Sequence, residues 1–132
     1  MVPTFPSDAD EQLVRRAREA AEHAYAPYSG IRVGAAVLTA TGRIFCGCNV
    51  ENASYGLAIC AERSAVFAAV AAEGPSMRIK AVALVNDDAR VKTPCGACRQ
   101  VVAELGPNAV FLLQDGKRVT IEKLLPAAFS LG

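Results

Sequence analysis

The chain lacks several features that mark large classes of proteins. Its 132 residues include no Trp and only one His, and Phe, Trp and Tyr together make up 6%. So few aromatic residues provide little material for a platform on which nucleobases stack. The 14 Lys and Arg residues against 13 Asp and Glu residues give a net charge of +1, and no stretch gathers the basic residues. We therefore expect no nucleic-acid partner.

Long hydrophobic runs are also missing. The longest uninterrupted apolar run spans residues 65–72, whereas a membrane helix needs about 20 residues. The first six residues have neither a basic start nor an apolar run, so they do not predict a secretion signal. We expect no membrane partner and a cytoplasmic location. In that reducing compartment, five cysteines indicate metal ligands, catalytic groups or small buried hydrophobes rather than disulfides.

The composition indicates one compact domain that buries part of its surface against other chains. A length of 132 residues is typical of a single domain, here residues 1–132. Apolar residues make up 52%, and charged residues make up 20%, below the usual share of about 25%. This apolar surplus favours the burial of some surface between chains.

The order of apolar stretches, Gly and Pro predicts a layered α/β domain around one mixed sheet. Ser7 with the acidic residues after it is typical of a helix start, and Gly-Pro pairs at 74–75 and 106–107 are typical of helix ends. The expected elements are a helix over 8–24, a hairpin of strands over 32–39 and 43–50, a polar loop over 51–56, a helix over 61–73, a strand over 79–85, a helix over 98–105, a strand over 109–113, a short strand from 119 and a helix over 122–125.

Two short motifs carry metal-ligand spacing, Cys60-Ala61-Glu62 and Pro94-Cys95-Gly96-Ala97-Cys98. Two cysteines three residues apart can reach a single ion from one turn of chain. Cys60 comes from the start of another expected helix. If the two helices lie side by side on the sheet, their N-termini converge and favour the thiolates that zinc requires.

Three protein ligands indicate catalytic zinc, because the fourth tetrahedral position stays open. Glu62 lies two residues from one ligand and can take a proton from water in that position and deliver it elsewhere. Zinc with three thiolates carries one net negative charge, which needs compensation nearby. The two helix N-termini and hydrogen bonds from Arg63 to the ligand sulfurs can supply it.

This arrangement is similar to the signature of zinc deaminases, H-x-E followed by P-C-x-x-C, with Cys60 in the place of the His. In its Cys form the chain resembles the small homotetrameric zinc-dependent cytidine deaminases of the cytidine and deoxycytidylate deaminase superfamily. The resemblance implies a three-layer α/β/α domain with a central mixed five-stranded sheet. It extends over residues 24–29, 33–35, 47–55, 60–63, 94–100 and 124–129.

The resemblance also implies a reaction and a cofactor. The reaction is hydrolytic deamination of cytidine and 2′-deoxycytidine to uridine and 2′-deoxyuridine, with release of ammonia, in pyrimidine salvage. One zinc ion per chain is then held by Cys60, Cys95 and Cys98, and Glu62 is the proton shuttle. Ala61 matches the residue whose backbone meets the pyrimidine.

Further positions match substrate contacts of that family. Asn49 and Glu51 match the pair that hydrogen-bonds the ribose 3′-hydroxyl, a task that suits an amide and a carboxylate. Ala53, Tyr55 and Phe129 match positions by which neighbouring subunits of the homotetramer complete each other's sites.

One position departs from the family pattern. Ile31 stands where the family commonly has Phe against the pyrimidine ring. Aliphatic contact remains, but an aromatic contribution of about 0.5–1.5 kcal/mol is absent. A zinc deaminase of the same fold that acts on an aminopyrimidine drug or antibiotic nucleoside is therefore the nearest rival, whereas the net charge argues against an editor of cytosine in RNA or DNA.

From another class, a small zinc-binding interaction module would explain the cysteines without chemistry. It predicts a closed metal site, with a fourth ligand from His23, Cys46 or Cys48. None of these is paired with the other ligands in a metal-binding spacing. We interpret Cys46 and Cys48 as small packing residues on one face of a strand, and His23 as a surface residue near a helix end.

Overall fold

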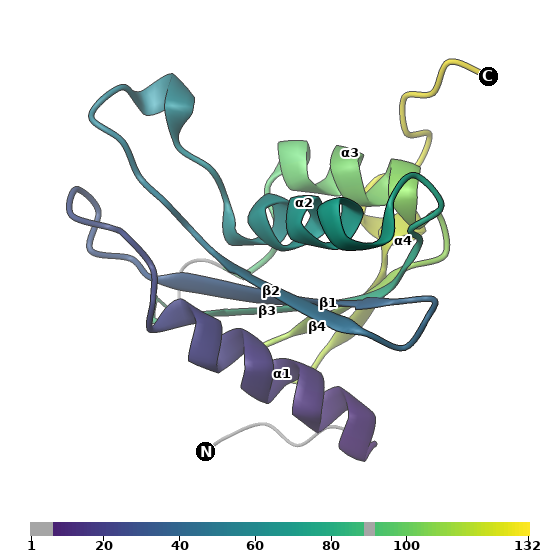
Figure 1. The fold of residues 1–132 in the computed structure, drawn as a ribbon, viewed down its shortest axis with the longest axis horizontal. Helices are drawn as coiled ribbons and strands as arrows, with labels where there is room; N and C mark the ends of the chain where they lie inside the picture. The colour runs from purple at the N-terminus through teal and green to yellow at the C-terminus, as the bar shows by residue number, and fades with distance from the viewer. Residues whose placement is uncertain (1–6, 89–91) are drawn as a thin grey trace.

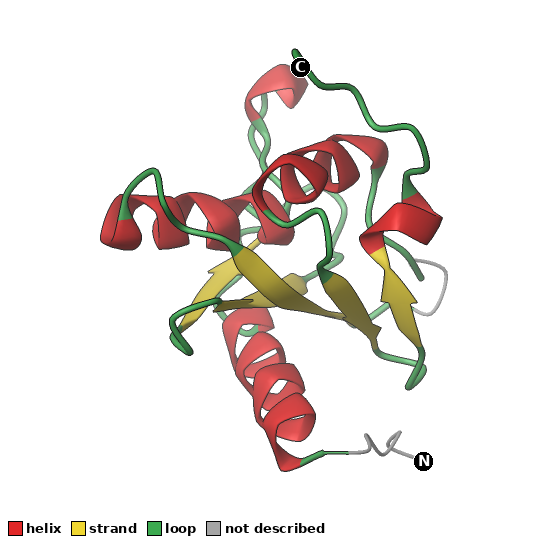
Figure 2. Cartoon of the chain, turned by 90° about the vertical axis from the view of Figure 1, so that its right-hand side faces the viewer, coloured by secondary structure: helices red, strands yellow, loops and turns green. Residues whose placement is uncertain are grey.

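The computed structural model describes residues 7–88 and 92–132. A five-stranded sheet lies between α1 on one face and α2, α3 and α4 on the other (Figure 1). Figure 2 shows the same three layers from the side. The elements are α1 (Asp8–Ala21), β1 (Val33–Thr39), β2 (Ile44–Cys48), the 3-10 helix η1 (Tyr55–Leu57), α2 (Ala61–Glu73), β3 (Ile79–Asn86), α3 (Gly96–Leu105), β4 (Val110–Leu113), β5 (Arg118–Thr120) and α4 (Ile121–Leu124).

The sheet is mixed, with the strand order β2-β1-β3-β4-β5. Only β3 and β4 run parallel, as expected for two strands joined by a helix, and the other three pairs are antiparallel. Val33 at the start of β1 pairs with Asn86 at the end of β3, so these two inner strands place the start of one beside the end of the other. The predicted three-layer α/β/α fold with a mixed five-stranded sheet is confirmed.

Local chemistry sets where α1 begins, and a contact distant in sequence sets where it ends. Ser7 is the N-cap of α1, and its side chain accepts a hydrogen bond from the backbone of Asp10 at 3.1 Å. The helix ends at Ala21 rather than near Ala24, because Tyr25 leaves it to donate to the carbonyl of Asn49 and to form a parallel bridge with Val50. The loop expected over 51–56 contains the start of η1, which the sequence did not predict.

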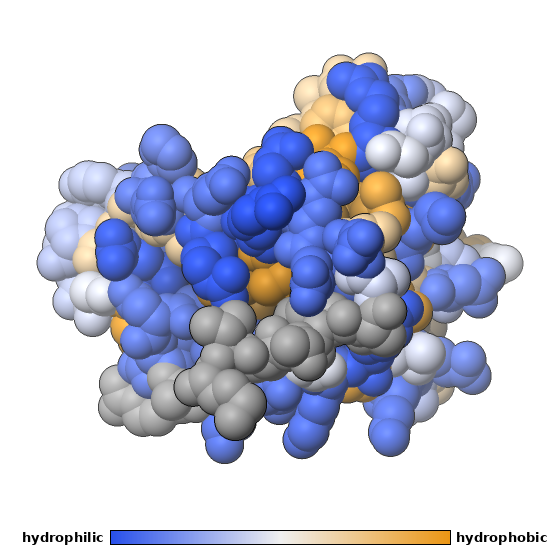
Figure 3. Space-filling model, turned by 90° about the horizontal axis from the view of Figure 1, so that it is seen from below, coloured by the Kyte–Doolittle hydropathy of each residue, from blue (hydrophilic) through white to orange (hydrophobic). Residues whose placement is uncertain are grey.

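Two apolar clusters pack on opposite faces of the sheet. The smaller one joins Leu13, Val14 and Ala17 of α1 to small residues of β1 and β3. The larger one joins α2, α3 and α4 to the other face. Seen from the side that carries α1, the surface is mostly hydrophilic (Figure 3). In the described ranges 7–88 and 92–132, no helix combines the length and the hydropathy needed to cross a bilayer.

Two glycines allow the helices to approach the sheet unusually closely. A Cβ atom on Gly34 would lie 1.9 Å from the carbonyl oxygen of Ala17 in α1. A Cβ atom on Gly47 would lie 2.4 Å from the backbone nitrogen of Ala65 and 2.6 Å from the carbonyl oxygen of Ala61. These atoms belong to backbone and cannot swing away, so Gly47 sets how deeply the start of α2 is seated on β2.

Gly47→Ala is therefore expected to destabilise the protein by about 1–3 kcal/mol or more, the usual effect of overpacking. Urea unfolding of the variant and of the wild type measures the difference. Gly56→Ala is the control, because no atom lies within 4 Å of a Cβ at Gly56. Equal unfolding free energies for Gly47→Ala and wild type would contradict the close approach of α2 to β2.

Candidate metal centre and active site

Three cysteines meet where α2 and α3 begin. Cys60 is the N-cap of α2, Cys95 is the N-cap of α3, and Cys98 lies in the first turn of α3. The Sγ atoms of Cys60 and Cys95 are 3.7 Å apart, and those of Cys95 and Cys98 are 3.5 Å apart. All three sulfur atoms lie within 4.8 Å of one another. The predicted convergence of two helix N-termini is therefore present in the structure.

The group fits a zinc ion. Zinc–sulfur bonds of about 2.3 Å in tetrahedral geometry place two ligand sulfurs about 3.8 Å apart, close to the separations found. Within residues 7–88 and 92–132, no fourth His, Cys, Asp or Glu belongs to the group. A structural zinc site would have four protein ligands. The donor set is therefore that of an open zinc site, held by Cys60, Cys95 and Cys98.

The surroundings favour a thiolate at Cys60. Nη2 of Arg63 donates a hydrogen bond to Sγ of Cys60 at 3.3 Å. Hydrogen bonds from the Cys98 thiol and from Arg63, opposed by burial, lower the pKa of the Cys60 thiol to about 5. The hydrogen bond with Cys60 and burial raise the pKa of the more deeply buried Cys98. Arg63 thus supplies positive charge beside the ligand sulfurs, as expected from its place after Glu62.

Glu62 lies in the first turn of α2 and is only 4% exposed. Burial raises the pKa of its carboxyl, and the negative charge on Cys60 acts in the same direction. A raised pKa makes the carboxyl group hold its proton more readily, which suits a general acid and base. The side chain also lines the cavity beside the cysteines.

A cavity of about 440 Å³ opens beside this group, where β1 begins and β3 ends. Its size is in the range of small-molecule sites. It brings together residues that were predicted from the sequence and others that were not. The predicted ones are Asn49, Glu51, Tyr55, Cys60, Ala61, Glu62, Arg63 and Cys95, and the others are Val33, Ala58, Ile59, Leu84 and Thr93.

Two polar side chains on the wall of the cavity are held by backbone. Asn49 accepts a hydrogen bond from the Val33 amide at 2.7 Å and donates one to the Ile31 carbonyl at 2.9 Å. Glu51 accepts hydrogen bonds from the loop before β1, and the one from the Ser29 side chain is the largest cause that lowers its pKa. Both side chains are therefore held in place at the wall of the cavity.

Three predicted contact residues do not line this cavity. Ile31 lies next to it, where its backbone joins Asn49 and the Ser29 hydroxyl. Ala53 is exposed in the loop before η1. Phe129 is 69% exposed on the tail after α4, and its carbonyl accepts a hydrogen bond from Gln100 at 3.1 Å. The roles expected for these residues stay predictions.

Arg99 and Gln100 follow Cys98 directly, and the sequence alone did not predict a role for them. Nε of Arg99 donates to the carbonyl of Pro94 at 2.8 Å, and its Nη1 donates to the carbonyl of Leu124 at 2.8 Å. Gln100 reaches the tail at Phe129. The two side chains therefore tie the metal-binding loop to the C-terminal segment. Two polar residues directly after a metal-binding Cys are the signal that could have revealed them.

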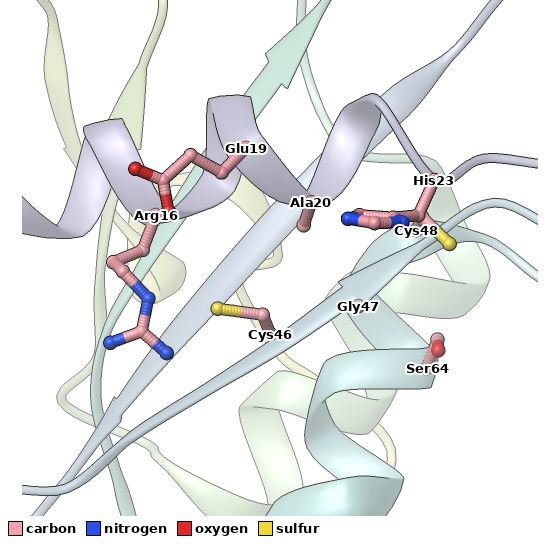
Figure 4. A pocket seen from close by; sticks show the side chains of 8 residues that line it. All are labelled: Arg16, Glu19, Ala20, His23, Cys46, Gly47, Cys48 and Ser64. Carbon is pink, nitrogen blue, oxygen red and sulfur yellow. The ribbon is translucent and has the colours of Figure 1, made fainter.

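The remaining cysteines face α1 and lie apart from the metal group. Cys46 and Cys48 on β2 line a second pocket of about 400 Å³ together with Arg16, Glu19, Ala20, His23, Gly47 and Ser64 (Figure 4). Both thiols are partly buried, and burial raises the pKa of Cys48. His23 is exposed just beyond the end of α1, as expected. None of the three belongs to the metal group.

Known proteins resemble the chain over nearly its whole length. The family described as "Cytidine and deoxycytidylate deaminase zinc-binding region" matches residues 7–114. Cytidine deaminase of Halalkalibacterium halodurans is 49% identical over 125 residues, covering 91% of this chain and 93% of the relative. Cytidine deaminase of Sporosarcina psychrophila is 46% identical over 125 residues, covering 91% and 90%. The crystal structure of cytidine deaminase from Burkholderia pseudomallei has a TM-score of 0.84 at 48% identity, covering 90% of this chain and 98% of that one.

Arg63→Ala is expected to weaken zinc binding about 10–100-fold, the usual effect of removing a group that supports a ligand. Competition with a chromophoric chelator measures the affinity. Arg78→Ala is the matched control, because Arg78 donates to the carbonyls of Pro75 and Met77 at the other end of α2. Unchanged zinc affinity in Arg63→Ala would show that the guanidinium does not stabilise the thiolates.

Proposed function

The chain belongs to the cytidine and deoxycytidylate deaminase family, and from this premise we propose that it is a zinc-dependent cytidine deaminase. It converts cytidine and 2′-deoxycytidine to uridine and 2′-deoxyuridine and releases ammonia. The observation that carries the proposal is the open group of three thiols beside the buried Glu62, on the wall of one cavity.

The chemistry divides between the metal and Glu62. When bound to Cys60, Cys95 and Cys98, zinc makes water a stronger nucleophile by lowering its pKa. Glu62 accepts the proton that the water loses and carries it to N3 of the pyrimidine ring. It then takes the second proton of that water from the oxygen now bonded to C4 and delivers it to the 4-amino group, so that the C4 carbonyl forms as the C4–N bond breaks and ammonia leaves. The raised pKa of Glu62 suits both steps, because the group must gain and lose a proton in each turnover.

The rest of the cavity binds the nucleoside in this proposal. Asn49 and Glu51 bind the ribose 3′-hydroxyl, and the backbone of Ala61 contacts the base. Ile31 provides aliphatic contact near the ring, in place of an aromatic side chain. The fixed positions of Asn49 and Glu51 support this arrangement, since neither needs to reorient before a ribose binds.

The active form in this proposal is a homotetramer whose sites are completed by neighbouring subunits. Large apolar side chains that the isolated chain leaves exposed support it: Tyr55 is 82% exposed, Leu57 72%, Phe129 69% and Phe67 51%. The loop that carries η1 and the C-terminal tail both project on the side of the sheet that carries α2 and α3 (Figure 1). Ala53, Tyr55 and Phe129 would contact the site of a neighbour.

The wider setting is also proposed. The whole chain, residues 1–132, forms one deaminase domain that acts on small nucleosides in the cytoplasm, in pyrimidine salvage. Nucleic acids and membranes are not partners. The near-neutral charge and the lack of a basic run support this setting.

Glu62→Gln is expected to keep one zinc per chain and to lower kcat for cytidine by about 10²–10⁴-fold, because the amide cannot carry the proton. Cytidine loss, ammonia release and bound zinc are measured together. Glu104→Gln, an exposed acid on α3, is the control and should keep full activity. Full activity of Glu62→Gln would refute the role of Glu62, and a zinc-loaded wild type that leaves cytidine and 2′-deoxycytidine intact would refute the function.

Shared sites can be tested by complementation. Chains with Glu62→Gln keep Tyr55 and Phe129, and chains with Tyr55→Ala and Phe129→Ala keep Glu62. Co-expression of the two inactive chains is expected to give mixed oligomers with activity that neither has alone, because some sites combine intact parts from different chains. Activity no greater than the sum of the parents, or an active monomer at all dilutions, would contradict the assembly.

A further inference from the structure

Ser29 and its neighbour Tyr28 supply every hydrogen bond that the structure shows on the Glu51 carboxylate. The backbone amides of Tyr28 and Ser29 donate to Oε1 at 2.9 and 3.1 Å. The Ser29 hydroxyl donates to Oε2 at 2.5 Å. One dipeptide in the loop before β1 therefore holds both oxygens of a carboxylate that lies 22 residues further along the chain.

The direction of the hydroxyl proton is set by the Glu51 carboxylate, which can only accept hydrogen bonds. The Ile31 amide donates to Oγ of Ser29 at 3.0 Å, so Oγ acts there as an acceptor. A serine hydroxyl has a single proton to donate. That proton is donated to Oε2 of Glu51. The two hydrogen bonds therefore have the same direction, from the Ile31 amide to Oγ of Ser29 and from Oγ to the carboxylate.

With the hydrogen bonds from residues 7–88 and 92–132 counted, the carboxylate has one acceptor position left. Its two oxygens offer about four lone-pair sites. The two lone-pair sites on Oε1 accept hydrogen bonds from the two backbone amides, and one site on Oε2 accepts the hydrogen bond from the Ser29 hydroxyl. A single lone-pair site on Oε2 is left.

Glu51 lies where a ligand can reach it. The Glu51 side chain lines the cavity of about 440 Å³ beside the cysteines and also a neighbouring hollow of about 360 Å³. Tyr55 and Ala58 are common to both walls, whereas Ser29 lines only the second. Ser29 thus contacts Glu51 from the hollow that holds none of the metal ligands, while Glu51 also borders the cavity beside the cysteines.

We propose that Ser29 is a positioning residue that holds Glu51 so that its one free acceptor site selects nucleosides with a 3′-hydroxyl group. This inference rests on the proposed function and adds a residue to which no role was assigned. A carboxylate that only accepts hydrogen bonds favours a ligand that donates one. A nucleoside without the 3′-hydroxyl cannot donate this hydrogen bond to Glu51. Because the Ser29 hydroxyl holds Glu51 in place, the preference for nucleosides with a 3′-hydroxyl depends on Ser29.

The test compares 2′-deoxycytidine with 2′,3′-dideoxycytidine, which differ only in the 3′-hydroxyl. Ser29→Ala is expected to raise KM for 2′-deoxycytidine about ten-fold, the effect of about one hydrogen bond to a charged group, with kcat nearly unchanged. The kinetic constants for 2′,3′-dideoxycytidine should stay within about two-fold of wild type. Ser29→Thr keeps the hydroxyl and is expected to restore the lower KM.

Ser76→Ala, an exposed serine beyond α2, is the matched control and should not change either substrate. Equal losses on both substrates would show that Ser29 is only structural, and an unchanged KM would show that its hydroxyl does not position Glu51. Either result would overturn the inference while the deaminase function stands. A wild type without activity on 2′-deoxycytidine would instead refute the proposed function, which the first assay reveals before any variant is made.

Discussion

Two helix N-termini converge on one group of three sulfur atoms, and the rest of the site depends on that convergence. Cys60 caps α2 while Cys95 caps α3, so each helix directs its positive end toward the thiols. The first turn of α2 also carries Arg63, which donates a hydrogen bond to Sγ of Cys60, and Glu62, which is buried at the wall of the cavity. Three thiolates around a divalent zinc ion leave one net negative charge, and the helix ends and Arg63 offset it without a fourth protein ligand. The position of α2 in turn depends on Gly47, where any side chain would collide with helix backbone.

The part of the cavity wall formed by Asn49 and Glu51 is built differently, from side chains tied to backbone. Asn49 is fixed by the start of β1, and Glu51 is fixed by the loop that precedes it. Preorganised contacts of this kind reduce the entropy lost when a ligand binds. The cysteines and the two polar side chains border one cavity, where β1 begins and β3 ends. Arg99 donates a hydrogen bond to the carbonyl of Leu124 and so connects the metal-binding loop to the C-terminal segment that carries Phe129.

Much of this arrangement could be predicted from local patterns. Helix α2 begins and ends where Cys60 and Gly74 indicate, and the spacing of Cys95 and Cys98 identified two metal ligands. Features set by contacts distant in sequence were harder to predict. Helix α1 ends early because Tyr25 pairs with the segment after β2, and the strand order depends on packing that no single segment encodes. Ser29 was missed because a serine in a loop has no periodicity, and its partner Glu51 becomes visible only after folding.

The central claim is that zinc is held by three cysteines with one position left open. X-ray absorption at the zinc edge of the purified protein counts the sulfur neighbours of the metal directly. The account predicts three sulfur neighbours at about 2.3 Å and one lighter neighbour per zinc. Four sulfur neighbours would mean that another cysteine, such as Cys46 or Cys48, closes the site, and they would contradict an open catalytic metal.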